Sequence, residues 1–239
     1  MNFSIRSYQN ELLDRDDIPF EDIRQNMQEL NFINTWLGGH AITIHAFKTL
    51  CGNKKQISVC EIGCGGGDNL LAIEKWCNKN GIKVQLSGID MKPECITFAE
   101  ARTAFSSPVN WITSDYQKVI FDVKPDIIFS SLFCHHFTDN ELIFQLKWMK
   151  ENAQTGFFIN DLQRHFVSYY SIKILTTIFS KSYLVKNDAP LSVLRGFTKN
   201  ELQHLLEQAA IKGFEVKWKW AFRWVVTSRV LHSSRVSHS

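Results

Sequence analysis

The sequence lacks the features that mark several classes of protein. No apolar run reaches the length needed to cross a bilayer, and the polar N-terminus, acidic by residue 22, predicts no signal peptide. No dense run of lysine or arginine occurs and the net charge is only +3, so a surface that tracks nucleic acid is not indicated. Internal repeats, low-complexity tracts and interdomain linkers are also absent. We therefore expect a cytoplasmic monomer or homodimer with no nucleic-acid partner and no integral membrane contact.

The six cysteines do not form the pattern of a disulfide framework. They are Cys51, Cys60, Cys64, Cys77, Cys95 and Cys134. Their scatter through expected strands, helices and a glycine-rich loop is typical of free thiols in a reducing compartment, which again predicts the cytoplasm. Cys60 and Cys64 have the spacing of half a zinc site, but no second ligand pair follows at a matching interval. We therefore expect no metal site.

What the sequence does contain is a glycine-rich turn between an expected strand and an expected helix. The short β-branched run over residues 57–62 is typical of a buried parallel strand, and residues 68–80 carry apolar side chains at helical spacing. Between them, Gly63, Gly65 and Gly67 permit backbone angles that a β-carbon forbids, and they leave no side chain between the chain and a ligand. The segment therefore predicts a ligand bound against bare backbone.

The spacing of these glycines separates two classes of ligand. The dinucleotide fingerprint is G-x-G-x-x-G, and its last position is here Asp68, whose carboxylate would repel a pyrophosphate. Glu61 lies two residues before the first glycine, at the end of the expected strand, where a carboxylate can hold an ammonium group. The pattern thus favours a ligand that carries an ammonium group over a dinucleotide.

This pattern resembles motif I of the class I S-adenosylmethionine-dependent methyltransferases, and the resemblance covers the chain from about residue 57 to its C-terminal strands. In that family the acidic residue at the position of Glu61 organises the methionine end, and the glycine loop lies along the methionine and ribose. The resemblance implies methyltransferase activity with S-adenosyl-L-methionine as the cofactor. The segments INDLQRHF and LSVLRGFTKNEL are similar, more narrowly, to small-molecule methyltransferases of bacterial pigment, quinone or polyketide pathways.

Polar residues after the next strands complete the implied cofactor site. The expected strand 83–89 delivers Asp90 at its carboxyl end, about where a ribose-binding carboxylate stands, and Met91 follows to cover one face of the adenine. The expected strand 109–113 leads to a segment in which, by the resemblance, Asp115 accepts from the adenine amino group. The implied cofactor-binding residues are Glu61, Gly63, Cys64, Gly65, Gly67, Asn69, Asp90, Met91, Ser114, Asp115, Tyr116 and Ser131.

A histidine pair lies where the reacting atoms are expected. The apolar run 125–131 predicts a fourth parallel strand, and ligands of open α/β sheets bind beyond the carboxyl ends of such strands. A capping box of Thr138 and Glu141 starts the next helix, which leaves His135 and His136 in the short loop before it. Histidine suits general-base catalysis because its pKa is about 6.5, so both are candidate catalytic residues. The alternative is the structural or cofactor-contacting role that a similar loop has in many class I methyltransferases.

Together with the resemblance, these elements predict an α/β fold. We expect a Rossmann-like, seven-stranded, mostly parallel sheet with an antiparallel last strand and helices on both faces. Residues 1–50 are expected to form an N-terminal helical cap, and residues 51–239 the S-adenosylmethionine-binding methyltransferase domain. A substrate-lid insert is expected at about 162–197, after the fifth strand over 156–160.

The insert contains a helix over 166–179 that is apolar except for one lysine, followed by an expected loop over 181–196. Such a helix must be covered. It is either a lid whose aromatic face meets an apolar substrate, or a packing or dimer helix. We expect residues at the start of the insert to meet the acceptor. The candidates are Asp161, Arg164, Tyr169 and Tyr170 for substrate binding, and His165 as a third catalytic residue.

The abundant Trp and Phe and the apolar insert favour a small apolar or aromatic acceptor. We expect a phenol, quinone or polyketide-like compound, methylated at oxygen or carbon in secondary metabolism. Positioning the two ligands in line can supply most of the catalysis. Two alternatives stay open. An RNA or protein methyltransferase needs a continuous basic surface at the pocket mouth, and a nicotinamide-dependent or non-catalytic Rossmann protein would bind adenosylhomocysteine poorly.

Overall fold

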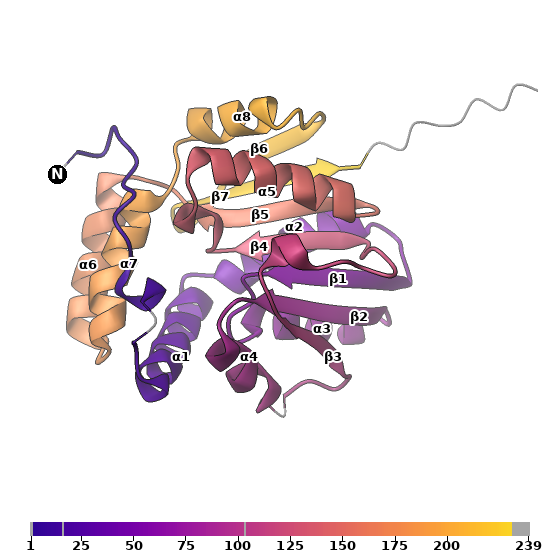
Figure 1. The fold of residues 1–239 in the computed structure, drawn as a ribbon, viewed down its shortest axis with the longest axis horizontal. Coiled ribbons are helices and arrows are strands. Elements are labelled where there is room, and N and C mark those ends of the chain that lie inside the picture. The colour runs from indigo at the N-terminus through magenta and orange to yellow at the C-terminus, as the bar shows by residue number, and fades with distance from the viewer. Residues whose placement is uncertain (1, 16, 103, 231–239) are drawn as a thin grey trace, which may run out of the picture.

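A seven-stranded sheet forms the centre of the protein (Figure 1). The computed structural model describes residues 2–15, 17–102 and 104–230. The strands are β1 (Gln56–Ile62), β2 (Lys83–Asp90), β3 (Val109–Thr113), β4 (Ile127–Ser131), β5 (Gly156–Leu162), β6 (Phe214–Lys219) and β7 (Arg223–Arg229). In the order β3-β2-β1-β4-β5-β7-β6, the first five are mutually parallel and β7 is antiparallel to both neighbours. This confirms the expected Rossmann-like fold with its mostly parallel sheet and antiparallel last strand.

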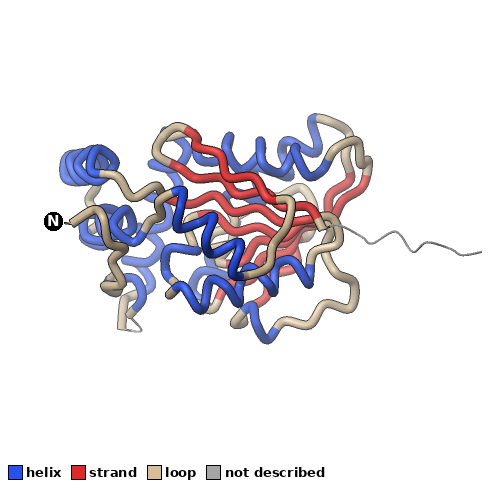
Figure 2. Tube along the Cα trace, turned by 90° about the horizontal axis from the view of Figure 1, so that it is seen from above, coloured by secondary structure: helices blue, strands red, loops and turns tan. Residues whose placement is uncertain are grey.

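Helices cover both faces of this sheet (Figure 2). They are α1 (Phe20–Trp36), α2 (Gly39–Cys51), α3 (Asp68–Lys79), α4 (Pro93–Glu100), α5 (Asp139–Asn152), α6 (Phe166–Phe179), α7 (Tyr183–Arg195) and α8 (Lys199–Gln208). Three 3₁₀ turns, η1 (Leu12–Asp14), η2 (Tyr116–Lys118) and η3 (Cys134–His136), lie in the connections. Helices α2, α3 and α4 pack on one face, and α5 and α8 pack on the other.

Alternate strand positions fill two separate cores, because successive side chains of a strand point to opposite faces. Phe129 of β4 and Phe158 of β5 stack with ring centroids 4.7 Å apart on the face covered by α2 and α3. Their neighbours Ile128 and Phe157 are fully buried against α5 and α8 on the opposite face. Helix α2, which the sequence analysis assigns to the N-terminal cap, therefore belongs to the layer that covers the sheet.

The turn before α3 needs glycine for packing as well as for its backbone angle. Gly67 is the N-cap of α3 with φ 73°, in the left-handed region that favours glycine. A Cβ built on Gly67 would meet the ring of Trp111 at 2.5 Å. The third glycine of the loop thus brings α3 close to β3, and it does not line the cavity described below.

The expected loop over 181–196 is wrong, because this segment forms helix α7 with Pro190 in its interior. The Asp-Ala-Pro sequence has the composition of a turn, and proline lacks the N–H that a helix interior uses. Packing outweighs that preference here, since Leu184 and Val185 are completely buried and Leu191 and Val193 nearly so. The remaining expected helices and strands agree with the structure to within two residues at most ends.

A helical cap lies beyond the carboxyl ends of the parallel strands, on the left in Figure 1. It comprises the N-terminal segment with η1, together with α1, α6 and α7. The N-terminal segment is fixed to the rest of the protein by Arg6. Its guanidinium donates to the carbonyl oxygens of Arg195 (2.8 Å), His135 (3.1 Å) and Phe137 (2.7 Å). Two segments far apart in sequence, the cap and the loop after β4, are therefore joined through one buried cation.

Within the described residues, no helix combines the length and hydrophobicity that a transmembrane span requires.

Thr138→Ala is expected to lower the free energy of unfolding by about 1 kcal/mol, because it removes the side-chain acceptor that caps α5. The capping box is formed in the structure, with the Glu141 carboxylate accepting from the Thr138 N–H (2.7 Å). Chemical denaturation measures the change. Thr138→Ser keeps the hydroxyl oxygen and should stay close to wild type; an equal loss in both variants would contradict the capping assignment.

Candidate active site

A cavity of about 920 Å³ opens between the cap and the carboxyl ends of the parallel strands. Its walls come from the N-terminal segment, α1, the glycine loop, the ends of β2 and β4, helices α6 and α7, and the β6–β7 turn. Ligands of open α/β sheets bind at this edge of the sheet. The expected cofactor residues that line the cavity are Glu61, Gly63, Cys64, Gly65, Asn69, Asp90, Met91, Ser114, Tyr116 and Ser131.

The glycine loop presents bare backbone to this cavity. Gly65 has φ 50°, and a Cβ built on it would meet no atom of the protein within 4 Å, since the space beside it is open cavity. Its N–H donates to Asp90 Oδ2 (2.9 Å), and the Lys92 N–H donates to Asp90 Oδ1 (2.9 Å). The carboxylate at the end of β2 is therefore held beside the loop, and burial raises its pKa.

A chain of polar side chains crosses the floor of the cavity from β1 to β7. Asn69 Nδ2 donates to Glu61 Oε1 (3.0 Å), and Asn69 Oδ1 lies 2.8 Å from Nδ1 of His40. Asn34 lies beside His40, and its Oδ1 accepts from Nη2 of Arg223 (3.1 Å). The chain thus links a buried carboxylate on β1 to a buried guanidinium on β7.

Both ends of this chain have a free polar atom. Glu61 Oε2 and Arg223 Nη1 are buried and have no hydrogen-bond partner among the residues that the structure describes, and both residues line the cavity. Burial raises the pKa of Glu61 well above its usual value and lowers the pKa of Arg223 to about 10. Unpaired buried charges are costly, so the arrangement favours a ligand that brings a cation to one end and an anion to the other.

The histidine loop forms the turn η3 at the end of β4, where His135 is buried between two carboxylates. Its Nδ1 lies 2.7 Å from Asp161 Oδ1, and its Nε2 lies 3.6 Å from Glu11 Oε1. Burial lowers the pKa of His135, but the charges and hydrogen bonds of Asp161 and Glu11 outweigh it and raise the pKa to about 9. His135 is therefore an imidazolium at neutral pH, which argues against the general-base role that we expected for it.

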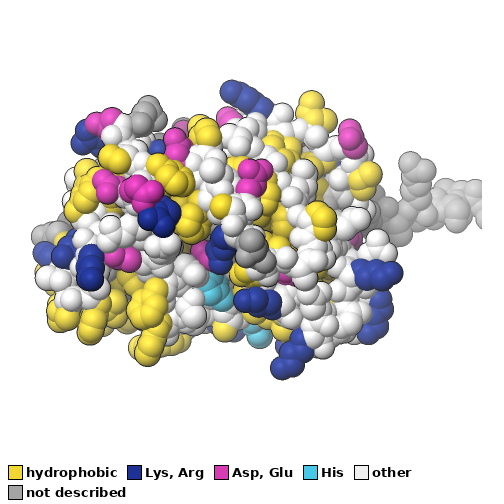
Figure 3. Space-filling model, turned by 90° about the horizontal axis from the view of Figure 1, so that it is seen from below, with side chains coloured by type: hydrophobic (Ala, Val, Ile, Leu, Met, Phe, Trp, Pro, Cys, Tyr) yellow, Lys and Arg dark blue, Asp and Glu magenta, His cyan; other side chains and the backbone are white. Residues whose placement is uncertain are grey.

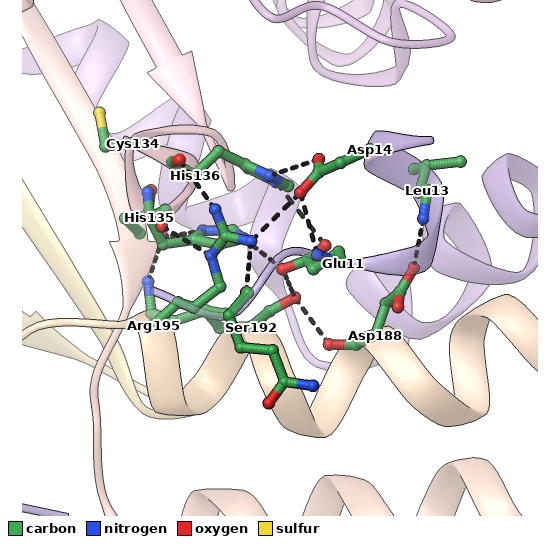
Figure 4. Close-up of polar contacts among 12 residues, drawn as sticks. Glu11, Leu13, Asp14, Cys134, His135, His136, Asp188, Ser192 and Arg195 are labelled. Atoms are coloured by element: carbon green, nitrogen blue, oxygen red, sulfur yellow. Dashed lines mark hydrogen bonds and ion pairs between the residues drawn. The ribbon is translucent and has the colours of Figure 1, made fainter. Parts of the chain in front are cut away.

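His136 is the more accessible of the pair. Its Nδ1 lies 3.2 Å from Asp14 Oδ1, and its Nε2 lies 3.8 Å from Glu11 Oε2. Figure 4 shows Arg195 of α7 beside the histidine loop, where its guanidinium donates to the carbonyl oxygens of His135 (3.1 Å) and His136 (2.8 Å). The side chain of His136 is thus left at the cavity wall, between the sheet and the N-terminal segment.

Glu11, His135 and His136 are also the three residues, within the described part of the chain, whose ligand atoms lie close enough together to bind a metal ion. These atoms lie within 4.8 Å of one another. The imidazolium of His135 already supplies a positive charge at this place, and the carboxylates of Glu11 and Asp161 neutralise it. This arrangement accounts for the buried carboxylates as ion pairs.

Several expected site residues lie outside the cavity wall. They are Gly67, Asp115, Asp161, Arg164, His165, Tyr169 and Tyr170. Asp115 caps η2 by accepting from the Gln117 N–H, and His165 caps α6 in the same way through Nδ1. The guanidinium of Arg164 is buried and donates to the carbonyl oxygens of Phe3 (2.9 Å) and Gly196 (2.6 Å) and to Glu201.

The side chains of these residues therefore have structural contacts in place of the substrate contacts that we expected. Asp161 acts on the site through His135 and through its charge on Arg223, and Tyr169 is buried against Phe3. Tyr170 faces outward and is half-exposed. The apolar pattern predicts the helix start at residue 166 but not the direction of each side chain around it.

Sequence reasoning missed Glu11, Asp14 and Arg223. The two acidic residues precede the first expected helix in a segment with no periodic pattern, so nothing in the sequence places them at the sheet. Arg223 follows a run of aromatic residues in a strand pattern. A cation at an inward position of a buried strand needs a partner, and this was the signal in the sequence that could have indicated its role.

Comparison with known proteins then identifies the family. Residues 53–210 match the family described as "Methyltransferase domain", which is more than half of the chain. The protein belongs to this methyltransferase family. A comparison with curated protein sequences finds no match.

Solved structures with the same fold include further methyltransferases. The plantazolicin methyltransferase BpumL in complex with SAH has a TM-score of 0.66 and 18% identity, over 91% of this chain and 92% of that one. Human N-acetylserotonin methyltransferase in complex with SAM has a TM-score of 0.61 and 17% identity, over 93% and 63%. Magnesium protoporphyrin IX methyltransferase from Synechocystis PCC 6803 with bound SAH has a TM-score of 0.51 and 14% identity, over 94% of this chain and 90% of that one. At these identities the likeness is one of fold.

We predict that the free energy of unfolding falls as pH rises from about 6.5 to about 9. The pKa of His135 in the folded protein, about 9, lies above the unfolded value of 6.5. Its contribution is therefore complete below pH about 6.5 and is lost as pH rises through about 9, a difference of about 3 kcal/mol. Chemical denaturation across this range measures the loss.

Glu11→Gln should move the fall to lower pH and reduce its size, because it removes one of the two carboxylates that stabilise the imidazolium. His204→Gln, which changes an exposed histidine of α8, serves as the control and should keep the wild-type slope. A wild-type slope in Glu11→Gln would contradict the protonation assigned to His135.

Proposed function

We propose that this methyltransferase transfers the methyl group of S-adenosyl-L-methionine to a small apolar or aromatic acceptor in the cavity. The placement of the cofactor rests on two buried atoms without a partner among the described residues, Glu61 Oε2 and Arg223 Nη1. The amino-acid end of the cofactor has an ammonium and a carboxylate. These groups are opposite in charge to Glu61 and Arg223 and can supply the missing partners. On this proposal the ammonium binds Glu61 and the carboxylate binds Arg223.

The rest of the cofactor follows the edge of the sheet. Asp90 stands at the end of β2, where a carboxylate can accept from the ribose hydroxyls, and the loop at Gly65 lies alongside. Met91 and Tyr116 line the next part of the cavity, and we propose that they flank the adenine ring. Asp115 caps η2 outside the cavity wall, so the adenine amino group has no carboxylate at that position in this structure.

The acceptor is proposed to occupy the part of the cavity under the cap. Apolar side chains of four segments line it, and they are Leu13, Ile18, Met27, Leu30, Ile172, Leu175 and Phe222. A cavity of this size and lining suits a planar or lipidic body with few polar groups. Such acceptors include phenols, quinones and polyketide-like compounds, which are typical of secondary metabolism.

The histidine loop gives this end of the cavity its chemistry. For a phenolic acceptor, we propose that His136 accepts the hydroxyl proton and that the imidazolium of His135 stabilises the phenolate. Bound S-adenosyl-L-methionine would supply the methyl group: its carbon–sulfur bond would break as the phenolate oxygen bonds to the methyl carbon, and the electron pair of the broken bond would stay on sulfur. Alignment of oxygen, carbon and sulfur supplies much of the rate.

The charges at the site favour a neutral acceptor over an amine. Glu11 and Asp14 face the cavity, but each already has a cationic partner: Glu11 Oε1 lies 3.6 Å from Nε2 of His135, and Asp14 Oδ2 accepts from Nη1 of Arg195 (3.2 Å). Asp14 accordingly has a pKa well below its usual range because of these partners. A cationic acceptor would therefore compete with cations that the protein already holds there.

The acceptor is tested by incubating the protein with labelled S-adenosylmethionine and a panel of phenols, quinones, amines, RNA and peptides. The proposal predicts label transfer to members of the phenol or quinone group, with a lower rate in His136→Ala and an unchanged affinity for S-adenosylhomocysteine. Transfer confined to RNA or to peptides would contradict it.

Gly65→Val is expected to weaken S-adenosylhomocysteine binding by at least about tenfold, because the side chain would occupy the space in which the cofactor meets bare backbone. Isothermal titration calorimetry measures the affinity. Gly81→Val is the matched control, since Gly81 also has a positive φ (65°) and open space beside it but lies outside the cavity wall. Equal affinity in the two variants would place the cofactor elsewhere.

Glu61→Gln and Arg223→Met are each expected to reduce the affinity for S-adenosylhomocysteine by about tenfold to a hundredfold, as the loss of a charge-assisted hydrogen bond does. The same calorimetry tests adenosine as a second ligand. Adenosine lacks the amino-acid end, so its affinity should be the same in both variants and wild type. A parallel loss of adenosine binding would show that the substitutions disturb the fold and not the proposed contacts.

A further inference from the structure

Helix α6 exposes most of its large apolar side chains, and two of its three buried residues are small and polar. Phe166, Tyr170, Ile174 and Ile178 are all more than half exposed, with Ile178 at 66%. The buried residues of the same helix are Ser168, Tyr169 and Thr176. A helix that only packs onto a soluble protein has the opposite arrangement, with its apolar stripe facing the core.

The exposed apolar residues form one continuous face. Phe166, Tyr170, Ile174 and Ile178 recur every four residues, which places them above one another on a helix, and Val167 stands beside them. Phe179 extends the face at the end of the helix and is 74% exposed. We call these six residues the α6 outer face. In Figure 3, hydrophobic side chains gather at this end of the molecule, on the left.

Basic and not acidic residues border this face. The sequence from Leu162 to Asn187 contains no aspartate or glutamate, and three of its lysines, Lys173, Lys181 and Lys186, are exposed. The acidic side chains of the elements packed against α6 are hydrogen-bonded within the protein. Asp188 of α7 accepts from the backbone N–H groups of Leu12 and Leu13.

Helix α1 supplies the other acidic groups near this end, and they are also paired. Glu29 accepts from the Ser180 hydroxyl and from the Lys181 and Ser182 N–H groups at the α6–α7 junction. Asp22 accepts from the Tyr183 hydroxyl (3.1 Å). The outer face is thus apolar and aromatic, with exposed lysines on the same helix and in the segment that follows it.

We propose that the α6 outer face binds the surface of an anionic phospholipid bilayer. Apolar and aromatic side chains on one side of a helix, bordered by lysines, suit insertion into the headgroup region, where lysine amines meet lipid phosphates. The helix has 14 residues, too few to cross a bilayer, so it lies in the plane of the surface. This contact is peripheral and is compatible with the absence of a transmembrane span among the described helices.

The opposite side of the same helix borders the cavity, which Ser168, Ser171, Ile172 and Leu175 line. Docking through the outer face would therefore bring the cavity wall next to the lipid. An apolar acceptor that partitions into the bilayer could reach the site past α6. This consequence rests on the proposed function, whereas bilayer binding itself does not, so the two can fail separately.

Vesicle flotation tests the proposal with the full chain. Vesicles of phosphatidylcholine with about 30 mol % phosphatidylglycerol carry the negative surface that the lysines should detect. The protein is expected to float with these vesicles, and Lys173→Gln and Lys181→Gln should each weaken binding about fivefold. Equal binding to pure phosphatidylcholine vesicles, or no binding to either, would overturn the proposal.

The apolar half of the contact is tested by the double variant Ile178→Ser with Phe179→Ser, which should weaken vesicle binding at least about tenfold. The matched control is Ile120→Ser with Val123→Ser, because these side chains are 92% and 79% exposed on the connection between β3 and β4. The control should bind as wild type does. Light scattering supplies the other arm: a dimer that the Ile178 and Phe179 substitutions dissociate would assign this face to a second copy of the chain and overturn bilayer binding.

Discussion

The site depends on two buried charges that the protein leaves half-satisfied. Glu61 on β1 and Arg223 on β7 are joined by the Asn69–His40–Asn34 chain, yet each keeps one polar atom without a partner in the described part of the chain. Leaving such groups unpaired inside a protein costs stability, so their persistence at one cavity indicates that a ligand completes them. A methyl donor that carries an amino acid at one end has the charges to do so.

The cap over this cavity is held by hydrogen bonds of buried guanidinium groups and by ion pairs. Arg6 and Arg195 donate to the backbone carbonyls of the histidine loop, while Glu11 reaches His135 from the opposite side. Asp161 of β5 is the second carboxylate beside the imidazolium of His135. The N-terminal segment, the loop after β4 and helix α7 are therefore joined by charge and hydrogen bonding. The part of the cavity proposed for the acceptor is shaped by these contacts as well as by apolar packing.

The elements of the sheet were predictable from sequence because their signals are local. The run over 57–62, the glycines after it and the capping box at Thr138 each specify a strand, a turn or a helix start within a few residues. The same is true of Asp90: the strand pattern before it is enough to predict that it lies at the carboxyl edge of the sheet. The cofactor half of the cavity is built of such residues, so most of its candidates do line it.

The acceptor half was less predictable, because it is made by contacts between distant segments. Glu11 meets His135 across more than a hundred residues, and no pattern in the sequence marks that meeting. Arg164 and His165 stand next to the end of β5, as expected, but their side chains turn to backbone groups of the cap. Helix α7 formed despite Pro190 because tertiary burial outweighed a local preference.

A crystal structure with S-adenosylhomocysteine bound tests the central claim most directly. The account predicts that the ligand's amino group lies within hydrogen-bond distance of Glu61 Oε2 and its carboxylate within hydrogen-bond distance of Arg223 Nη1. A ligand bound with its amino-acid end elsewhere, with both of these atoms still unpartnered, would contradict the account.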